Sequence, residues 1–260
     1  MQQRHIDRRQ YFNELANTSR KFYIDYLKPY VDITPDTKVL EIGCGEGGNL
    51  LPFAELGCYV KGIEIENAKK FFAEEGQKGD FCAENFLNYP PQSNESKLFD
   101  IVLIHDCIEH IEQPDKAEFF TKIKPLVREN GIVFFAFPAW QMPFGGHQQI
   151  CKSKVSKLPF IHLLPNPLYK GILHLGKEKE GTVNELLSIK RSKMPVERFE
   201  KVAKATGYGI VDKQLWFINP HYEQKFHLKP RKLSKVIAHL PWIRNFFTTS
   251  AFYLLKIINK

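Results

Sequence analysis

The sequence Val39-Leu40-Glu41-Ile42-Gly43-Cys44-Gly45-Glu46-Gly47-Gly48-Asn49-Leu50 joins an apolar run to a loop that has four glycines in six residues. Glycine is needed where a backbone turns with φ > 0 or where a ligand must approach the backbone closely. A strand that runs through such a loop into a helix leaves free backbone N–H groups at a cleft. The stretch therefore predicts the nucleotide-binding turn of a Rossmann-like domain.

Strand and helix patterns alternate along the chain around this turn. We expect parallel strands over residues 36–42, 59–64, 81–84, 99–104 and 132–137, with helical segments over 50–56, 67–75 and 114–127 between them. This alternation predicts a doubly wound α/β fold. Two further strand-like runs, 208–217 and 248–257, would complete a Rossmann-like seven-stranded sheet, mostly parallel with an antiparallel last strand.

The remaining sequence divides into three segments around the core at 36–137. Residues 1–35 form a helical segment with a break near Asn17, which either packs on the edge of the domain or brings Tyr11 or Phe12 over the nucleotide as a lid. Residues 138–194 form an inserted cap or acceptor region, because they are too apolar to be left in solvent. Residues 195–260 hold the closing helix and strands, with a basic insertion at 219–245.

The composition is that of a globular protein with a substantial core. The chain has 260 residues, of which 43% are hydrophobic and 13% aromatic. Its first residues are polar and give no signal peptide, and no apolar run approaches the ~20 residues of a membrane span. The five cysteines show no Cys-x-x-Cys spacing, which favours reduced thiols in the cytoplasm over disulfides or zinc ligands.

The net charge of +8 is divided unevenly along the chain. Residues 1–140 hold 16 Lys and Arg against 22 Asp and Glu, a net −6, whereas residues 141–260 hold 21 against 7, a net +14. The basic half could attract an anionic acceptor, a nucleic acid or a membrane surface. A soluble lysine-rich surface is an equally acceptable interpretation, since the lysines are scattered.

The glycine turn alone does not identify the nucleotide. Gly43, Gly45 and Gly48 satisfy the Gly-x-Gly-x-x-Gly dinucleotide pattern, and Glu64 ends the second strand at the place where an acid binds ribose hydroxyls. Glu41 lies inside the first apolar strand, where an acid is costly without a partner. Because the cationic amine of a methionine moiety would be such a partner, we expect S-adenosylmethionine rather than NAD.

Several motifs support this choice. The stretch 39–47 resembles motif I of the class I S-adenosylmethionine-dependent methyltransferases, and Gly62-Ile63-Glu64-Ile65 is similar to their acidic second motif. Residues 99–111 resemble the segment after strand four in the small-molecule branch, which includes ubiquinone-pathway enzymes, and residues 128–132 match the turn before strand five. The resemblance covers residues 38–137 and implies the cofactor and the fold, but not the acceptor.

The resemblance also implies roles for individual residues. It places the adenine beside Glu84 and Asn85, although Asp80 is a rival, and the ribose on Glu64. The full set of implied cofactor-binding residues is Glu41, Gly43, Cys44, Gly45, Gly47, Glu64, Ile65, Glu84, Asn85 and His105. No metal is expected, because no ligand cluster has a recognisable spacing.

Methyl transfer to a hydroxyl also requires removal of a proton, usually by His, Asp or Glu. His147 is the first candidate base and His105 the second, although either could instead have a structural role. His110 is equally suited to the site or to packing, and the stretches Asn166-Pro167-Leu168-Tyr169 and Asn219-Pro220-His221-Tyr222 are both interpreted as turns.

We expect an acceptor hydroxyl on a small molecule, a lipid-linked intermediate or a glycan, with possible contact to a membrane surface. The alternatives are an RNA or protein methyltransferase, an NAD-dependent oxidoreductase and a non-catalytic binding protein.

Overall fold

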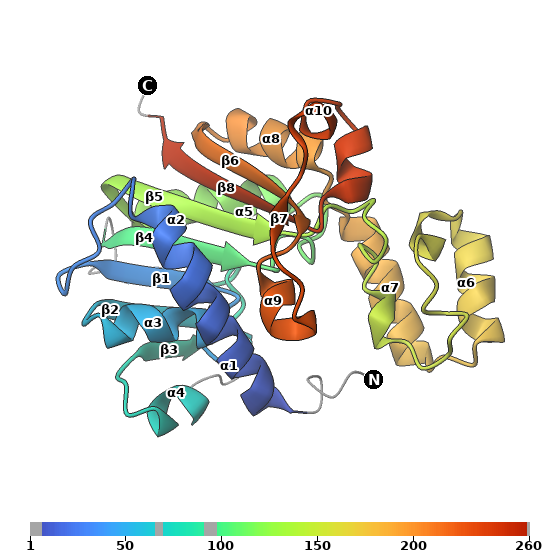
Figure 1. Ribbon diagram of the computed structural model, residues 1–260, viewed down its shortest axis with the longest axis horizontal. Helices are drawn as coiled ribbons and strands as arrows, with labels where there is room; N and C mark the ends of the chain where they lie inside the picture. Colours follow the sequence, from blue (N-terminus) through green and yellow to red (C-terminus); the bar gives the residue numbers. More distant parts are fainter. Residues whose placement is uncertain (1–6, 66–69, 91–97, 259–260) are drawn as a thin grey trace.

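The computed structural model describes residues 7–65, 70–90 and 98–258, which form an α/β protein with one central sheet (Figure 1). The strands are β1 (Lys38–Ile42), β2 (Tyr59–Glu64), β3 (Asp80–Ala83), β4 (Phe99–His105), β5 (Val127–Phe137), β6 (Tyr208–Ile218), β7 (Arg231–Lys232) and β8 (Ser250–Ile257). Their order in the sheet is β3-β2-β1-β4-β5-β8-β6-β7. Strands β1 to β5 pair in parallel, and β8 is antiparallel to both of its neighbours, β5 and β6.

The doubly wound, mostly parallel sheet with a reversed last strand is confirmed, but the expected number of seven strands is one too few. The additional strand, β7, is a two-residue segment that pairs antiparallel with β6 at the edge of the sheet. Two basic residues inside an irregular insertion carry no alternation of apolar and polar side chains, so nothing in the sequence marks them as a strand.

The N-terminal segment is one continuous helical run rather than two helices. It consists of α1 (Arg8–Thr18), a π-helical turn at Ser19–Tyr23 and α2 (Ile24–Leu27). The Asp7 carboxylate caps α1 by accepting a hydrogen bond from the Gln10 N–H at 2.9 Å. The break expected near Asn17 is wrong, because the backbone widens into the π turn and keeps helical angles on both sides.

Helices cover both faces of the sheet. One face packs against the N-terminal run and α3 (Leu51–Glu55), which continues a 3-10 turn at Gly48–Leu50. The other face packs against α5 (Lys116–Ile123), extended by a 3-10 turn at Lys124–Leu126, and against α8 (Val196–Ala205). Short α4 (Lys70–Glu74) lies near β3, and the helix cap expected at Asn67 falls outside the described residues.

Residues 138–194 form a cap that projects from the end of the sheet and has its own small core (Figure 1). The cap contains 3-10 turns at Gln148–Ile150 and Ile161–Leu163, and helices α6 (Asn166–Leu175) and α7 (Glu180–Ser192). His162 is fully buried between Trp140 and Gln148, and its Nε2 lies 2.9 Å from the Trp140 carbonyl oxygen. Burial lowers the pKa of this histidine to about 4, so it serves the packing of the cap.

The second insertion connects β6 to β8 and contains α9 (His221–Phe226), β7, α10 (Lys235–Ala238) and a 3-10 turn at Ile243–Phe247. Its end is fastened to α8, because the Arg244 guanidinium lies 2.9 Å from Glu197 and 3.2 Å from Glu200. Asn219 and Pro220 lead into α9, and the stretch from Asn166 to Tyr169 forms the start of α6, so the interpretation of both stretches as turns is wrong.

A carboxyl group is buried inside the first strand. Glu41 is fully buried, and its Oε1 accepts a hydrogen bond of 2.7 Å from Nδ2 of Asn49 in the turn that follows. Desolvation raises the pKa of Glu41 from its ordinary value of 4.5 to about 8. The neutral acid therefore ties the strand to the glycine turn at neutral pH.

We predict that Phe199→Ala will lower the free energy of unfolding by about 3–5 kcal/mol, the range for emptying a buried aromatic site. Phe199 is fully buried and contacts the rings of Phe120, Phe135, Phe137 and Tyr253. Urea denaturation measures the change. The matched control is Phe217→Ala, because Phe217 is 44% exposed, and an equal loss in both variants would contradict the assignment of this core.

We predict that Glu41→Gln will remove a pH dependence of stability. The folded state holds the Glu41 proton more tightly than the unfolded state, so this stabilisation is complete below pH ~4.5 and is lost as the pH rises through about 8. The free energy of unfolding of the variant should equal that of the wild type near pH ~5. Near pH ~9 it should exceed the wild-type value by on the order of a few kcal/mol. Parallel denaturation curves at all pH values would contradict a raised pKa.

Candidate functional site

A cavity of about 480 Å³ opens at the carboxyl ends of β1, β2 and β4. In open α/β sheets this edge is where ligands bind, at the point where the strand order reverses. Its walls come from the ends of these strands, from the loop after β3 and from the turn that leads into α5. The lining residues are Ile42, Gly43, Ile63, Glu64, Ile65, Glu84, Asn85, Phe86, Leu87, Asp106, Cys107, His110, Ile111, Glu112, Asp115 and Phe119.

The glycine turn closes one wall of this cavity. Gly43 has φ +74°, and its N–H donates to the Ile63 carbonyl oxygen at 2.8 Å. A Cβ at this position would lie 3.0 Å from Sγ of Cys107, so only glycine fits without a shift of the neighbouring loop. Gly47, at φ +82°, instead packs against the ring of Phe81 and keeps the turn compact.

Glu64 connects the second strand to the glycine turn. Its Oε2 accepts a hydrogen bond of 2.8 Å from the Gly45 N–H, and its Oε1 accepts one of 2.7 Å from the Ile65 N–H. A carboxylate oxygen has more than one lone pair, so these bonds leave acceptor capacity on a side chain that lines the cavity.

The structure brings half of the predicted cofactor-binding residues to the cavity. Gly43, Glu64, Ile65, Glu84 and Asn85 line it. The other five, Glu41, Cys44, Gly45, Gly47 and His105, are not among its lining residues. Three of these hold the turn instead, since Glu41 bonds Asn49, Gly45 bonds Glu64 and Gly47 packs on Phe81.

A second cavity of about 320 Å³ adjoins the first. Its walls come from α1, from the loop after β4, from the start of the cap and from α9. The lining residues are Arg8, Tyr11, Asp106, His110, Pro138, Met142, Phe144, His147, Gln149, Ile150, Asn219, His221, Tyr222, Lys225 and Thr249. Asp106 and His110 line both cavities, so the two spaces meet at these side chains.

The histidines predicted as bases lie in different surroundings. His147 lines the second cavity, and its ring centroid lies 4.9 Å from that of His110 in an edge-to-face arrangement. His105 is buried with its ring 5.8 Å from that of Tyr23, and it lines neither cavity. The geometry therefore brings His110 and His147 together and separates His105 from them.

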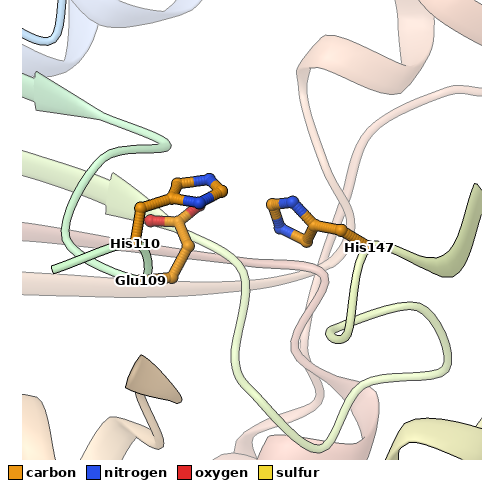
Figure 2. Close-up of side chains that lie close together, drawn as sticks. All are labelled: Glu109, His110 and His147. Atoms are coloured by element: carbon orange, nitrogen blue, oxygen red, sulfur yellow. The ribbon is translucent and has the colours of Figure 1, made fainter. Parts of the chain in front are cut away.

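Glu109 lies beneath this histidine pair. It is only 3% exposed, and neither carboxylate oxygen has a hydrogen-bond partner within the described residues. Desolvation, with a further contribution from Asp106, raises the pKa of Glu109 well above its ordinary value. One ligand atom each from Glu109, His110 and His147 lie within 4.8 Å of one another, so the three could hold a cation (Figure 2).

The turn that carries Glu109 and His110 is held from two sides. The buried Lys116 ammonium donates to the carbonyl oxygens of Ile108 at 2.7 Å and Ile111 at 2.8 Å, and desolvation lowers its pKa to about 8. From the cap, the Ser192 hydroxyl at the end of α7 donates to the Glu109 carbonyl oxygen. The cap is thus fixed directly to the turn between the cavities.

Sequence reasoning missed most of the second cavity. Tyr11 or Phe12 was expected to lie over the nucleotide as a lid, but neither lines the first cavity: Tyr11 lines the second, and Phe12 is fully buried in the core. Asn219, His221, Tyr222 and Lys225 carry no signal in the sequence, because their position depends on how the second insertion returns over the sheet. His110 and Glu109 had a signal in the 99–111 motif, but their roles did not follow from it.

Curated relatives of known name match the chain over part of its length. The ubiquinone biosynthesis O-methyltransferase of Pasteurella multocida (strain Pm70) is 26% identical over 146 residues, which are 50% of this chain and 60% of that protein. The enzyme of the same name from Aromatoleum aromaticum is 35% identical over 107 residues, 38% of this chain and 43% of that protein. The match thus spans about half the length of these relatives.

Solved structures share the fold over nearly the whole chain. A S-adenosylmethionine-dependent methyltransferase from Clostridium acetobutylicum ATCC 824 has a TM-score of 0.58 at 13% identity, covering 94% of this chain and 92% of that one. The 1,6-didemethyltoxoflavin-N1-methyltransferase of Burkholderia thailandensis has a TM-score of 0.54 at 12% identity, covering 99% and 84%. At these identities the likeness establishes the fold alone.

The sequence pattern of the methyltransferase domain family matches residues 7–211, well over half of the chain. This range includes the N-terminal helical run, the glycine turn, all residues that line the first cavity, and the cap. The chain therefore belongs to the methyltransferase domain family.

Proposed function

We propose that this protein binds S-adenosylmethionine in the first cavity and transfers its methyl group to a hydroxyl of an acceptor in the second. The observation that carries the proposal is that the two cavities meet at Asp106 and His110. Transfer from a sulfonium is an in-line displacement, so alignment of acceptor and methyl supplies much of the acceleration. Two adjoining spaces, lined in part by the same side chains, would hold donor and acceptor next to each other.

In this proposal each part of S-adenosylmethionine contacts a different group of residues in the first cavity. Glu64 accepts hydrogen bonds from the ribose hydroxyls, and the methionine moiety lies against the backbone at Gly43. The adenine lies between the loop at Glu84 and Asn85 and the apolar side chain of Phe86. Support comes from the Burkholderia thailandensis methyltransferase, which has this fold and was solved with S-adenosylhomocysteine bound.

An oxygen acceptor is supported by the names of the curated relatives, which are O-methyltransferases. A hydroxyl must lose its proton to become a good nucleophile, and the His110–His147 pair lies where the acceptor would enter. We propose a small molecule, a lipid-linked intermediate or a glycan as acceptor. An RNA or protein acceptor is the second candidate, favoured by the +14 charge of residues 141–260.

We further propose that the protein acts in the cytoplasm and touches an anionic membrane surface to reach its acceptor. All five cysteines are unpaired, which suits a reducing compartment. Exposed apolar side chains of the two insertions meet where the rings of Phe160 and Phe246 lie 6.4 Å apart, and Leu158 and Trp242 are more than half exposed nearby in sequence. Within the described residues, no helix is both long and apolar enough to cross a membrane.

We predict that the wild-type protein binds S-adenosylhomocysteine and that Glu64→Ala weakens this binding by about 10- to 100-fold, since hydrogen bonds to a charged group contribute ~1.5–3 kcal/mol. Isothermal titration calorimetry measures both affinities, and thermal unfolding checks that the variant is folded. Glu118→Ala, an exposed carboxylate on α5, is the matched control. Equal affinity in the wild type and Glu64→Ala would contradict the ribose assignment, and absence of binding would contradict the donor.

We predict that the protein co-sediments with vesicles containing anionic phosphatidylglycerol and much less with neutral phosphatidylcholine vesicles. Raising the salt concentration should release it, because exposed charge interactions are screened beyond ~10 Å at 0.1 M ionic strength. Trp242→Ala should weaken the association. Tyr59→Ala should not, because Tyr59 is an exposed aromatic residue at the start of β2, outside both insertions. Salt-dependent binding of RNA without binding to vesicles would favour the second candidate acceptor.

A further inference from the structure

The second cavity is lined by an apolar group of side chains and by a group of hydrogen-bond donors, which come from different parts of the chain. The apolar group belongs to the start of the cap and consists of Pro138, Met142, Phe144 and Ile150. The donor group belongs to α1 and to the segment with α9, and we call it the α1–α9 wall: Arg8, Tyr11, Asn219, His221, Tyr222 and Lys225. A molecule that fills this cavity must therefore combine an apolar body with a group that accepts hydrogen bonds.

The two helices of the α1–α9 wall contact each other through residues that line the cavity. Arg8 and Tyr11 are three positions apart on α1, and His221 and Lys225 are four positions apart on α9. Residues at these spacings lie on one face of a helix. The rings of Tyr11 and His221 lie 6.1 Å apart in an edge-to-face arrangement. The two faces therefore meet, and each brings one positive charge to the same wall.

Side-chain contacts fix α9 to the N-terminal run. The Thr18 hydroxyl oxygen lies 3.1 Å from Nδ1 of the buried His221, and the His221 N–H donates to Oδ1 of Asn219 at 3.0 Å. One turn further along the N-terminal run, the Lys21 ammonium lies 2.7 Å from the Glu223 carboxylate. The α1–α9 wall is therefore held in place by contacts within the protein.

Positive charge prevails on the α1–α9 wall. Among the described residues that line the second cavity, Asp106 is the one carboxylate, and it lies where the first cavity begins. Arg8 is also bonded to the glycine turn, because its Nε and one Nη lie 3.0 Å from Oε1 of Glu46. This ion pair orients Arg8 and offsets part of its charge. A guanidinium has five N–H donors, so Arg8 can bind a second anion as well.

Neutral donors accompany the two cations. Desolvation, with a further contribution from Asp106, raises the pKa of Tyr222 to about 12 and also raises the pKa of Tyr11. Both phenols therefore keep their O–H donors at neutral pH. Asn219 directs its Oδ1 to the His221 N–H, which leaves its amide nitrogen to donate. Cations surrounded by neutral donors suit an anionic group such as a phosphate or a carboxylate.

We propose that the acceptor is an amphiphilic anion whose phosphate or carboxylate group binds the α1–α9 wall at Arg8 and Lys225, while its apolar part packs against the cap. The inference rests on the proposed function, which assigns the second cavity to the acceptor. The +14 charge of residues 141–260 would attract such an anion from solution.

Anchoring through the anionic group would also orient the acceptor. The α1–α9 wall and the side chains of Asp106 and His110 line the same cavity, and these two side chains also line the first cavity. An acceptor bound by its anion can therefore direct its hydroxyl to the place where the donor begins. Charge-assisted hydrogen bonds are about twice as strong as neutral ones, so they would help to hold the alignment that in-line transfer requires.

Calorimetric titration of the full-length chain with phenyl phosphate, benzoate and neutral benzyl alcohol tests this wall, with and without S-adenosylhomocysteine. We expect both anions to bind the wild type and benzyl alcohol to bind at least about 10-fold more weakly. Arg8→Gln and Lys225→Gln should each weaken binding of the anions by about 10- to 100-fold. Tighter binding of phenyl phosphate would assign a phosphate to the acceptor, and tighter binding of benzoate a carboxylate.

Matched variants separate the anion site from a general effect of charge. Arg9→Gln and Lys229→Gln remove neighbouring cations that do not line the second cavity, so they should bind the anions as the wild type does. Arg8→Lys keeps the charge and should retain more affinity than Arg8→Gln. Thermal unfolding checks that each variant is folded.

Binding of S-adenosylhomocysteine separates the possible failures. Neither Arg8 nor Lys225 lines the first cavity, so the folded variants should keep their affinity for this ligand. The inference would be overturned if neither anion bound the wild type, if benzyl alcohol bound as tightly as the anions, or if both glutamine variants kept the wild-type affinity. Anion binding that depends on Arg8 and Lys225 in a protein that does not bind S-adenosylhomocysteine would instead count against the proposed function.

Discussion

The parallel pairing of β1 with β2 on one side and with β4 on the other is the constraint on which both cavities depend. In this register Ile42 lies beside Ile63 and Ile104, so all three strands end at the same edge of the sheet. Residues at or just after these strand ends, Gly43, Glu64 and Asp106, line one cavity although the first and the last are 63 positions apart in the sequence. One more residue in β2 than in β1 places the Glu64 carboxylate against the Gly45 N–H, so the register of the strands also fixes the turn.

The acceptor side is built on the same edge by the two insertions. The cap leaves the sheet after β5, and the second insertion leaves it after β6. Both strands are antiparallel to β8, which lies between them, so they run in the same direction and release their insertions at the same edge. The N-terminal run adds Tyr11 from the other side. In the proposed function, donor binding thus uses loops of the first half of the chain, whereas acceptor binding uses mainly the two insertions of the second half.

Much of the donor side could be predicted from sequence, because it depends on local rules. The strands, the glycine turn and Glu64 follow from hydrophobic runs, from positive φ angles and from the position of an acid at a strand end. The second cavity could not be predicted, because its walls depend on how the cap and the second insertion fold back over the sheet. His105 was the second candidate base, and His110 was equally suited to the site or to packing. The structure places His105, at the end of β4, against Tyr23 and His110, in the following turn, at the cavities. Glu109 and His110 have no metal-ligand spacing with His147, 37 residues away, so no motif could have joined them.

The buried carboxyl groups of Glu41 and Glu109 differ in their hydrogen-bond partners. Glu41 is held by Asn49 in the neutral form that its raised pKa favours, so it joins a strand to its turn and serves the fold. Glu109 is equally buried but bonds no side chain within the described residues, while its backbone and the neighbouring Lys116 hold the turn in place. An apolar side chain of similar size would avoid the desolvation penalty at this position. The two groups therefore differ in their anchoring: one oxygen of Glu41 is hydrogen-bonded to the glycine turn, whereas both oxygens of Glu109, at the junction of the two cavities, have no hydrogen-bond partner within the described residues.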